Sequence, residues 1–353
     1  MNKIDQFLEA MLKSNASDLH FVSGDPIRAR VHGELKVLVN DPLTPELAQE
    51  ALFEIMDATT QRTFEKEEAA DFAYEIEGVS RFRANAFRHL NGIGGIFRAI
   101  PSKALTLEDL GMPQVIHDMC KQTSGMILVT GKTGSGKSTT LAAMIDSINK
   151  NLKGHILTIE DPIEFVHKTQ QSLISQREIG VHSPSFAEAL HSALREDPDV
   201  NLVGEMRDLE TISIAVTAAE MGILVMGTLH TNGAGQTVDR IINSFPADKQ
   251  SHIRTMISTS LRGVVSQQLL PTKGHAGRIA ALEVLINTSA VANLIRQGKL
   301  DQLETAMQAG GNVGMQTMDS ALMALVEQAR IAGKDAYQQA NEKSKFERMK
   351  HET

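Results

Sequence analysis

The sequence predicts an α/β protein with at least two domains, and three observations support this prediction. After about residue 114, apolar runs alternate regularly with helical patterns, which is typical of a parallel sheet covered by helices. Before residue 101, alternating strand-like segments are separated by turns that contain glycine, which indicates a smaller α+β domain. A chain of 353 residues is long enough for two or three domains with cores of their own.

The N-terminal domain is expected to begin with a helix and to continue mainly as strands. Apolar side chains recur at helical spacing over residues 4–12: Ile4, Phe7, Leu8, Met11 and Leu12. "RARVHGEL" alternates like a strand, and Gly33 suits a hairpin turn. "TPELAQEALFEIM" predicts a helix, with Thr44 as its cap and Pro45 in its first turn. "DFAYEIEG", "SRFRANAFRH" and "GGIFRAIP" predict three further strands, so that this domain spans residues 1–101.

A linker over residues 102–113 is expected to lead into the larger domain, residues 114–287. Strand and helix patterns follow one another there as "GMILVTG", "KSTTLAAMIDSIN", "HILTIED", "SFAEALHSALRE", "VNLVGEM", "LETISIAVTAAEMG" and "ILVMGTLHT". Residues 288–333 are mostly helical in pattern. The tail, residues 334–353, is polar and charged, which predicts a frayed helix or a disordered segment.

Composition excludes several classes of function. The formal net charge of −8 argues against a general nucleic-acid binder, so no nucleic acid is expected as a partner. A single cysteine, Cys120, excludes a disulfide or a cysteine-based zinc site within one chain. With no Trp and two Tyr, an aromatic platform for stacking bases is not expected. The sequence shows neither a signal peptide nor a membrane-spanning run, so a cytoplasmic protein is expected.

The segment "GKTGSGKS", residues 131–138, matches the Walker A pattern, follows an apolar strand and opens a helix. Its glycines let backbone N–H groups point into one concavity beside a helix N-terminus, which favours phosphate. Lys137 is expected to reach the β- and γ-phosphates, and Ser138 to hold Mg²⁺. ATP and Mg²⁺ are therefore the expected cofactors, although the loop does not read the base. The expected nucleotide-binding residues are Gly131, Lys132, Thr133, Gly134, Ser135, Gly136, Lys137, Ser138 and Thr139.

"TIEDPIEF", residues 158–165, crowds three carboxylates at the end of the next predicted strand. Like charges at such an edge need a nearby cation. Because this strand end should lie beside the phosphates, we expect that cation to be Mg²⁺. Glu160 and Glu164 are candidates to hold the metal through its waters, Glu160 first, or to polarise the attacking water, and the choice between them for the second role stays open. Asp161 is expected to anchor the turn.

Two further strands also end in polar residues. "VNLVGEM" ends at Glu205, in a position like that of Walker B, where Asp is commoner. "GTLHT" ends at His230 and Thr231, and a neutral imidazole there can sense the γ-phosphate. A single histidine is more often structural, so the prediction for His230 depends on the neighbouring strands.

Several segments together resemble one family closely: "GKTGSGKSTTLAAMID", "ILTIEDPIEF", "QREIG", "LREDPDVNLVGEMRDLETI" and "GTLHTNGAGQTVDRIINSFP". Their order and spacing resemble the type IV pilus retraction ATPases, the twitching-motility PilT/PilU group, from about residue 17 to residue 322. The resemblance implies a PAS-like N-terminal domain and a RecA-like P-loop ATPase domain. It also implies a homohexameric ring with ATP at subunit contacts, at the cytoplasmic face of the inner membrane. An inner-membrane pilus platform protein is the implied partner, and a paralogous retraction ATPase is a further candidate.

The resemblance also assigns roles to particular residues. It makes residues 158–165 the aspartate box, residues 200–208 an atypical Walker B segment and His230 part of the histidine box. It implies cross-subunit contacts to phosphate from arginines of "SRFRANAFRHLNGIGGIFRAI", with Arg81 and Arg98 the first candidates and Arg83 the next. Ordinary ion pairing on the strand surface is an equally good interpretation of each arginine alone.

The chain departs from the family pattern at four positions. Lys132 replaces the usual Pro of Walker A, and Asn201 replaces an apolar residue of the Walker B strand. Ala292 and Gln297 replace the Arg and Glu of the retraction signature "AIRNLIRE". These changes leave three branches open: a main retraction motor, an accessory paralogue, or the motor of another pilus.

Alternative functions come from the wider superfamily and from other classes. A pilus-assembly or type II secretion ATPase is the nearest, but many of these carry a tetracysteine insert that a chain with one Cys cannot supply. A nucleotide-binding regulatory protein is a second alternative, and a DNA-translocating motor, disfavoured by the acidic charge, is a third. The sequence leaves open the direction and order of firing around the ring and the identity of the platform protein.

Overall fold

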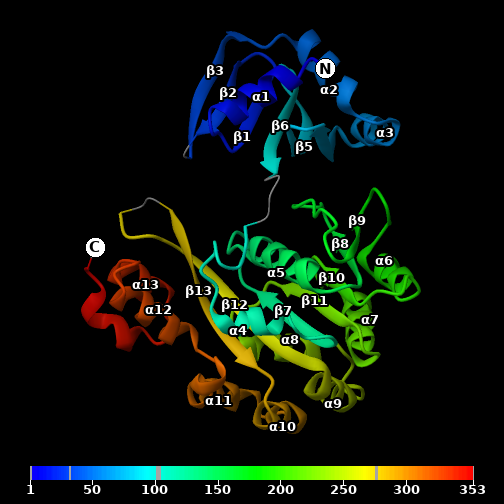
Figure 1. Ribbon diagram of the computed structural model, residues 1–353. Helices are drawn as coiled ribbons and strands as arrows, with labels where there is room; N and C mark the ends of the chain where they lie inside the picture. The colour runs from blue at the N-terminus through cyan, green and yellow to red at the C-terminus, as the bar shows by residue number, and fades with distance from the viewer. Residues whose placement is uncertain (1, 32, 101–104, 275–276, 353) are drawn as a thin grey trace. The chain divides into compact units, whose positions relative to one another are not determined.

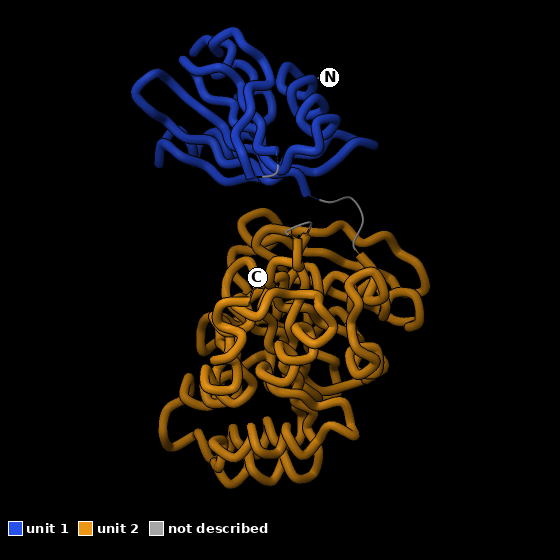
Figure 2. The backbone as a smooth tube through the Cα atoms, turned by 90° about the vertical axis from the view of Figure 1, so that its left-hand side faces the viewer, with its two compact units in different colours: residues 1–103 blue, residues 104–353 orange. Residues whose placement is uncertain are grey.

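The computed structural model describes residues 2–31, 33–100, 105–274 and 277–352. The chain divides into two compact units, Met1–Lys103 and Ala104–Thr353, coloured blue and orange in Figure 2. Each unit has hydrophobic clusters of its own, one in the first and three in the second. The units are described separately below.

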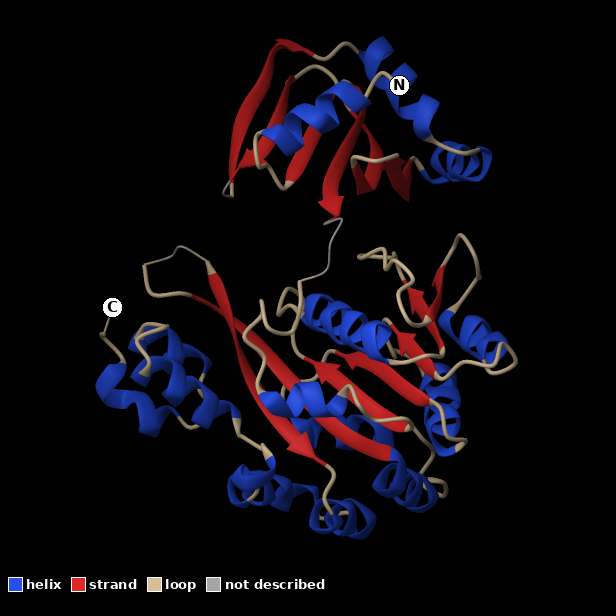
Figure 3. Ribbon diagram, viewed as in Figure 1, coloured by secondary structure: helices blue, strands red, loops and turns tan. Residues whose placement is uncertain are grey.

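The described part of the first unit is a six-stranded antiparallel sheet of order β3-β2-β1-β6-β5-β4, with helices on one face (Figure 3). Its elements are α1 (Asp5–Lys13), β1 (Asp18–Val22), β2 (Pro26–Val31), β3 (Glu34–Pro42), α2 (Pro45–Ile55), α3 (Ala58–Glu67), β4 (Ala69–Ile76), β5 (Ser80–His89) and β6 (Gly92–Ile100).

Local sequence explains most of these boundaries. Helix α1 buries Leu8 and Met11, the face expected from their spacing. Helix α2 begins at Pro45, and the Thr44 hydroxyl accepts the N–H of Leu47, as predicted for its cap. Helix α3 was not predicted, because Phe64 is its only buried apolar side chain and the rest of its sequence is polar.

The second unit is built on a seven-stranded sheet of order β13-β12-β7-β11-β10-β8-β9 (Figure 1). All of its strands are parallel except β13, which pairs antiparallel at the edge. The strands are β7 (Gly125–Thr130), β8 (His155–Glu160), β9 (Leu173–Glu178), β10 (Val200–Val203), β11 (Leu224–Leu229), β12 (Leu261–Pro271) and β13 (Arg278–Ile286).

Helices cover both faces of this sheet. Helices α4 and α5 pack on one face, and the cluster that contains α6 to α11 packs on the other. The helices are α4 (Gln114–Met119), α5 (Lys137–Asn151), α6 (Phe186–Ala193), α7 (Leu209–Glu220), α8 (Ala234–Asn243), α9 (Gln250–Ser260), α10 (Ser289–Gln297), α11 (Leu303–Ala309), α12 (Met318–Glu327) and α13 (Gly333–Gln339), with 3₁₀ segments η1 (Leu300–Gln302), η2 (Gly311–Val313) and η3 (Lys343–Met349). Because both faces are covered, central strands such as β7 are buried throughout, and β7 is apolar except for Thr130 at its end.

The segment expected to be a linker, residues 102–113, lies partly outside the described residues. Its described part packs on the second unit: Leu107 and Met112 are buried in the cluster formed by α4 and α5. The side chains of Thr106 and Asp109 each accept the other's backbone N–H, which fixes the turn between them.

The prediction that the tail is frayed or disordered is wrong for residues 334–352. Helix α13 and segment η3 pack against α12, and Ala336, Ala340 and Phe346 are buried there. The carboxylate of Asp319 accepts the backbone N–H groups of Asn341 and Glu342, which ties the tail to α12. The prediction failed because a few widely spaced apolar residues decide the packing of an otherwise polar segment.

No helix within the described residues is long and apolar enough to cross a membrane.

Candidate nucleotide site

The loop between β7 and α5 has the backbone conformation expected of a phosphate-binding loop. Gly134 and Gly136 have φ angles of 80° and 89°, in the left-handed region that side chains disfavour. Gly136 is the N-cap of α5 and offers no side-chain hydrogen bond to the first turn. The free backbone N–H groups of this helix end therefore favour an anion.

Lys137 is held inside the loop and is only 9% exposed. Its Nζ donates to the carbonyl oxygens of Gly131 and Lys132 at 2.8 and 3.2 Å. Burial lowers the pKa of Lys137, and the negative charges of Glu205 and Glu164 partly oppose that shift. Two of the three carboxylates predicted for the site, Glu164 and Glu205, therefore lie close enough to act electrostatically on this ammonium group.

Both carboxylate oxygens of Glu160 accept hydrogen bonds from the protein. Oε1 accepts from the Thr158 hydroxyl at 2.7 Å and from Gln176 Nε2 at 3.3 Å, and Oε2 accepts the Glu164 N–H at 3.4 Å. Burial raises the pKa of Glu160, these hydrogen bonds oppose the shift, and the charge of Glu164 adds to it. Glu160 thus fixes the turn after β8.

Glu164 and Asp161 differ from Glu160 in their surroundings. The side chain of Glu164 is exposed between two buried neighbours, Ile163 and Phe165. The backbone N–H of Ile163 donates to Glu178 at 3.0 Å. Among the contacts of the described residues, Glu160 and Glu178 hold this turn, and the expectation that Asp161 anchors it is wrong.

Glu205 and His230 meet at the ends of the neighbouring strands β10 and β11. Glu205 Oε1 lies 3.0 Å from His230 Nε2 and 2.5 Å from Arg207 Nε, and its side chain is 18% exposed. Burial pushes the pKa of Glu205 upward, but the hydrogen bond and charge of Arg207, with smaller contributions from His230 and Lys137, outweigh burial, so the pKa is lowered. Glu205 is therefore an ionised acceptor beside the phosphate loop.

Sequence analysis did not single out Arg207, Gln176 or Gln267. Arg207 stands in the quoted segment "VGEMRD", and its position after Glu205 was an available signal. Gln176 and Gln267 contact the site from strands β9 and β12, which sequence analysis did not predict individually.

The three candidate arginines belong to the first unit, on the sheet face that the helices leave uncovered. Arg83 of β5 lies directly opposite Arg98 of β6 in the antiparallel register. Arg81 is two positions from Arg83, so it lies on the same face of the sheet. Arg98 Nε donates to Asp18 at 2.8 Å, and the Asp18 side chain is nearly buried. Arg98 thus already has a structural ion pair.

A bound polyphosphate fits the residues present at the loop. Ser135 Oγ is buried and has no hydrogen-bond partner within the described residues. The Ser135 hydroxyl, the N–H groups of the α5 N-terminus and the ammonium of Lys137 are donors within a few residues of one another, and a polyphosphate can accept from all of them.

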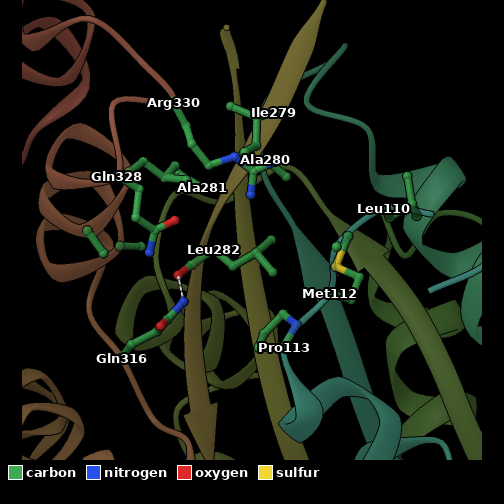
Figure 4. A pocket seen from close by; sticks show the side chains of 14 residues that line it. Leu110, Met112, Pro113, Ile279, Ala280, Ala281, Leu282, Gln316, Gln328 and Arg330 are labelled. Atoms are coloured by element: carbon green, nitrogen blue, oxygen red, sulfur yellow. Dashed lines mark hydrogen bonds between the residues drawn. The ribbon is translucent and has the colours of Figure 1, made fainter. Parts of the chain in front are cut away.

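A cavity of about 180 Å³ lies elsewhere in the second unit, beside the edge strand β13 (Figure 4). In Figure 4, Leu110, Met112 and Pro113 lie on one side of β13 and Gln328 and Arg330 on the other, and Gln316 Nε2 donates to the Leu282 carbonyl at 2.7 Å. Arg330 is the only charged residue among its described lining. The cavity offers no cluster of catalytic groups comparable with that at the phosphate loop.

The fold and the site define a P-loop nucleotide-binding protein with a mixed α/β architecture. The chain belongs to the family described as "Type II/IV secretion system protein", whose model matches residues 1–345. It is 48% identical over 337 residues to the type IV pilus retraction ATPase PilT of Pseudomonas aeruginosa, covering 96% of this chain and 98% of that one. It is 50% identical over 311 residues to a twitching motility protein of Neisseria gonorrhoeae, covering 88% and 83%.

A solved structure titled as the pilus retraction motor PilT with bound ADP superimposes on the chain with a TM-score of 0.92 at 43% identity, covering 99% of this chain and 100% of that one. The match to a type II secretion system ATPase E of Vibrio cholerae is 36% identical and covers 76% of this chain but 54% of that protein.

Proposed function

We propose that this protein is a motor ATPase that hydrolyses ATP to drive retraction of a type IV pilus. The observation that carries the proposal is a complete phosphate loop, flanked by Glu164 and Glu205, in a chain similar over nearly its whole length to retraction ATPases. The full-length match to PilT and the half-length match to a secretion ATPase favour retraction over assembly or secretion.

Each residue of the site has its own role in the proposed hydrolysis. The loop N–H groups and Lys137 bind the phosphates, and Ser138 would hold Mg²⁺, which neutralises phosphate charge when bound. Glu164, exposed and without the three donors that occupy Glu160, is the better placed to polarise the attacking water. Glu160 keeps the turn that presents Glu164, and a role for Glu160 on Mg²⁺ through water stays a prediction. Glu205 holds His230 where the imidazole can respond to the γ-phosphate.

The working assembly is proposed to be a homohexamer at the cytoplasmic face of the inner membrane. Arg81, Arg98 and Arg83 would contact phosphate across subunit boundaries, with the first unit a PAS-like domain and the second a RecA-like domain. The antiparallel sheet with helices on one face and the parallel sheet with helices on both support these two assignments. A platform protein of the pilus machine is the proposed partner, a paralogous retraction ATPase a second one, and nucleic acid is not expected.

The proposal is tested by replacing Lys137 with Ala, beside Lys150→Ala at the far, exposed end of α5 as the control. Lys137→Ala should abolish steady-state ATP hydrolysis, and cells that carry it should keep excess surface pili and lose twitching, whereas Lys150→Ala should do neither. Loss of all surface pili would indicate assembly instead. Nucleotide binding by the unaltered protein without measurable turnover would indicate a regulatory switch.

A further inference from the structure

Strand β12 lies against the phosphate loop, and the side chain of its Gln267 contacts the loop. We propose that Gln267 of β12 is a positioning residue that holds the phosphate loop in its nucleotide-binding shape. The inference rests on the proposed function only in that the loop binds a nucleoside polyphosphate. Gln267 lies outside every sequence segment that marks the nucleotide site.

The carboxamide of Gln267 joins the loop to the first turn of helix α5. Its Nε2 donates to the Ser135 carbonyl oxygen at 2.7 Å, and its Oε1 accepts from the Thr140 hydroxyl at 2.8 Å. Gln267 is 3% exposed, so water cannot replace either bond. Both contacts link residues more than 120 positions apart in the sequence.

The glycines of the loop make room for this strand as well as for backbone turns. A Cβ at Gly131 would lie 2.4 Å from the Gln267 carbonyl oxygen, and a Cβ at Gly136 would lie 2.7 Å from Gln267 Nε2. Gly131 and Gly136 therefore let β12 approach closely enough for the carboxamide to reach Ser135. The loop glycines and Gln267 form one packed unit.

An amide is the side chain that this position requires. The Ser135 carbonyl needs a donor, and the Thr140 hydroxyl needs an acceptor, and Gln supplies both from one planar group. Glu at this position would place a carboxylate oxygen against the carbonyl oxygen and add negative charge beside the phosphate site. Leu would leave both groups buried without partners.

The neighbouring residue provides a matched control. Gln268 points to the opposite face of β12 because side chains alternate along a strand. Its Oε1 is buried and has no hydrogen-bond partner within the part of the chain that the structure describes. Gln268→Leu therefore changes the same chemical group one position away without touching the loop.

The experiment measures ADP binding by titration calorimetry on the full-length protein, together with its thermal unfolding without nucleotide. Gln267→Glu and Gln267→Leu should each weaken ADP binding at least about tenfold, equivalent to about 1.4 kcal/mol. Gln268→Leu should leave the Kd within about twofold of the unaltered protein. Thr140→Val, which removes one of the two bonds, should weaken binding less, and its effect should largely vanish in the Gln267→Leu background.

Several results would overturn the proposal. Normal ADP affinity in folded Gln267→Glu and Thr140→Val proteins would exclude a positioning role. Equal losses of affinity in the Gln267→Leu and Gln268→Leu proteins would show general destabilisation of β12 instead. Failure of the unaltered protein to bind ADP would refute the nucleotide site itself, which is distinguishable from failure at Gln267 alone.

Discussion

The carboxyl groups of Glu160 and Glu164 are four residues apart, yet they have different chemical surroundings. Three donors reach Glu160, and none of the described side chains holds Glu164. A carboxylate that polarises water must have a free lone pair directed at that water. The three donors on half-buried Glu160 and the exposure of Glu164 therefore support the different roles proposed for them.

Glu164→Gln should therefore keep ADP affinity and lower kcat by about 10²–10⁴-fold, the usual worth of a general base. Glu160→Gln should lower kcat less, because the amide oxygen can still accept from the Thr158 hydroxyl and keep most of the turn. Some loss is expected, because the new NH₂ group faces the Glu164 N–H, and two donors repel each other. Single-turnover hydrolysis with ADP titration separates the two variants. An equal or greater loss of kcat in Glu160→Gln would assign the base role to Glu160.

Replacing Arg207 tests the role of Glu205 through the dependence of kcat on pH. Arg207 is the strongest of the neighbours that lower the pKa of Glu205, so Arg207→Ala should raise that pKa. Because the proposed mechanism needs the ionised carboxylate of Glu205, the acid limb of the kcat–pH profile should shift to higher pH. The stability that Glu205 contributes is present above its unfolded-state pKa and is lost as pH falls through its lowered native pKa, so Arg207→Ala should also reduce resistance to acid unfolding.

The control for this prediction is Arg240→Ala, on the exposed side of α8. It removes the same charge from the protein without touching Glu205. A pH profile that shifts equally in both variants would attribute the effect to net charge.

At the scale of the elements, strands β12 and β13 organise both sides of the nucleotide site. Ser266 Oγ accepts the Gly233 N–H at 2.9 Å, next to Gln267, which holds the phosphate loop. Glu283 of β13 accepts the N–H groups of Ala234 at 2.7 Å and Met318 at 3.2 Å, so it joins the N-termini of α8 and α12. The segment after His230 and the C-terminal helices are thereby attached to one pair of strands.

Strand β10 carries an unusual residue in the sheet interior. Asn201 is 0% exposed, and both polar atoms of its side chain have no hydrogen-bond partner within the described residues. It lies in register between Leu157 of β8 and Val225 of β11. A buried amide without partners destabilises the folded state.

Asn201→Leu should therefore raise the free energy of unfolding by about 1–3 kcal/mol, measured by denaturant titration. The control is Asn149→Leu, because Asn149 is also 0% exposed but bonds to the Lys168 carbonyl and the Gln170 N–H, and its loss should destabilise. Destabilisation by Asn201→Leu would show that the Asn201 amide is satisfied in solution.

At the scale of the whole molecule, the proposed ring places residues of two chains around one nucleotide. The uncovered sheet face of the first unit presents Arg83 and Arg98 side by side, which suits a contact with the phosphates of another subunit. An arginine of this kind contributes about 10³–10⁵ in rate in other phosphoryl-transfer enzymes.

A mixture of Arg98→Ala and Lys137→Ala chains, each inactive alone, should recover part of the ATPase activity because some sites then combine intact residues from both chains. The control is Arg88→Ala, on the same strand as Arg83 but on the helix-covered face, where Arg88 lies over the ring of Phe64. It should retain hydrolysis. No recovery at any ratio, in rings shown to exchange subunits, would refute a shared site with Arg98.

Local features of the site could be predicted from the sequence. The phosphate loop, the strands that lead to Glu160, Glu205 and His230, and the start of α2, with its Thr44 cap and Pro45 in the first turn, are encoded within a few consecutive residues. Hydrophobic periodicity depends on neighbours three or four positions apart, or on alternate positions, so it predicts elements well. The same reasoning predicted the parallel α/β core and the sheet edge at which the acids gather.

Only the tertiary structure decided which polar groups are free and which are already occupied. Gln267 reaches the loop because β12 lies beside β7 in the sheet, and Glu160 is occupied because β9 brings Gln176 beside it. The tail packs because Asp319 and a few apolar side chains of distant segments meet. Such contacts depend on strand order and on cores assembled across more than a hundred residues, and no local pattern specifies them.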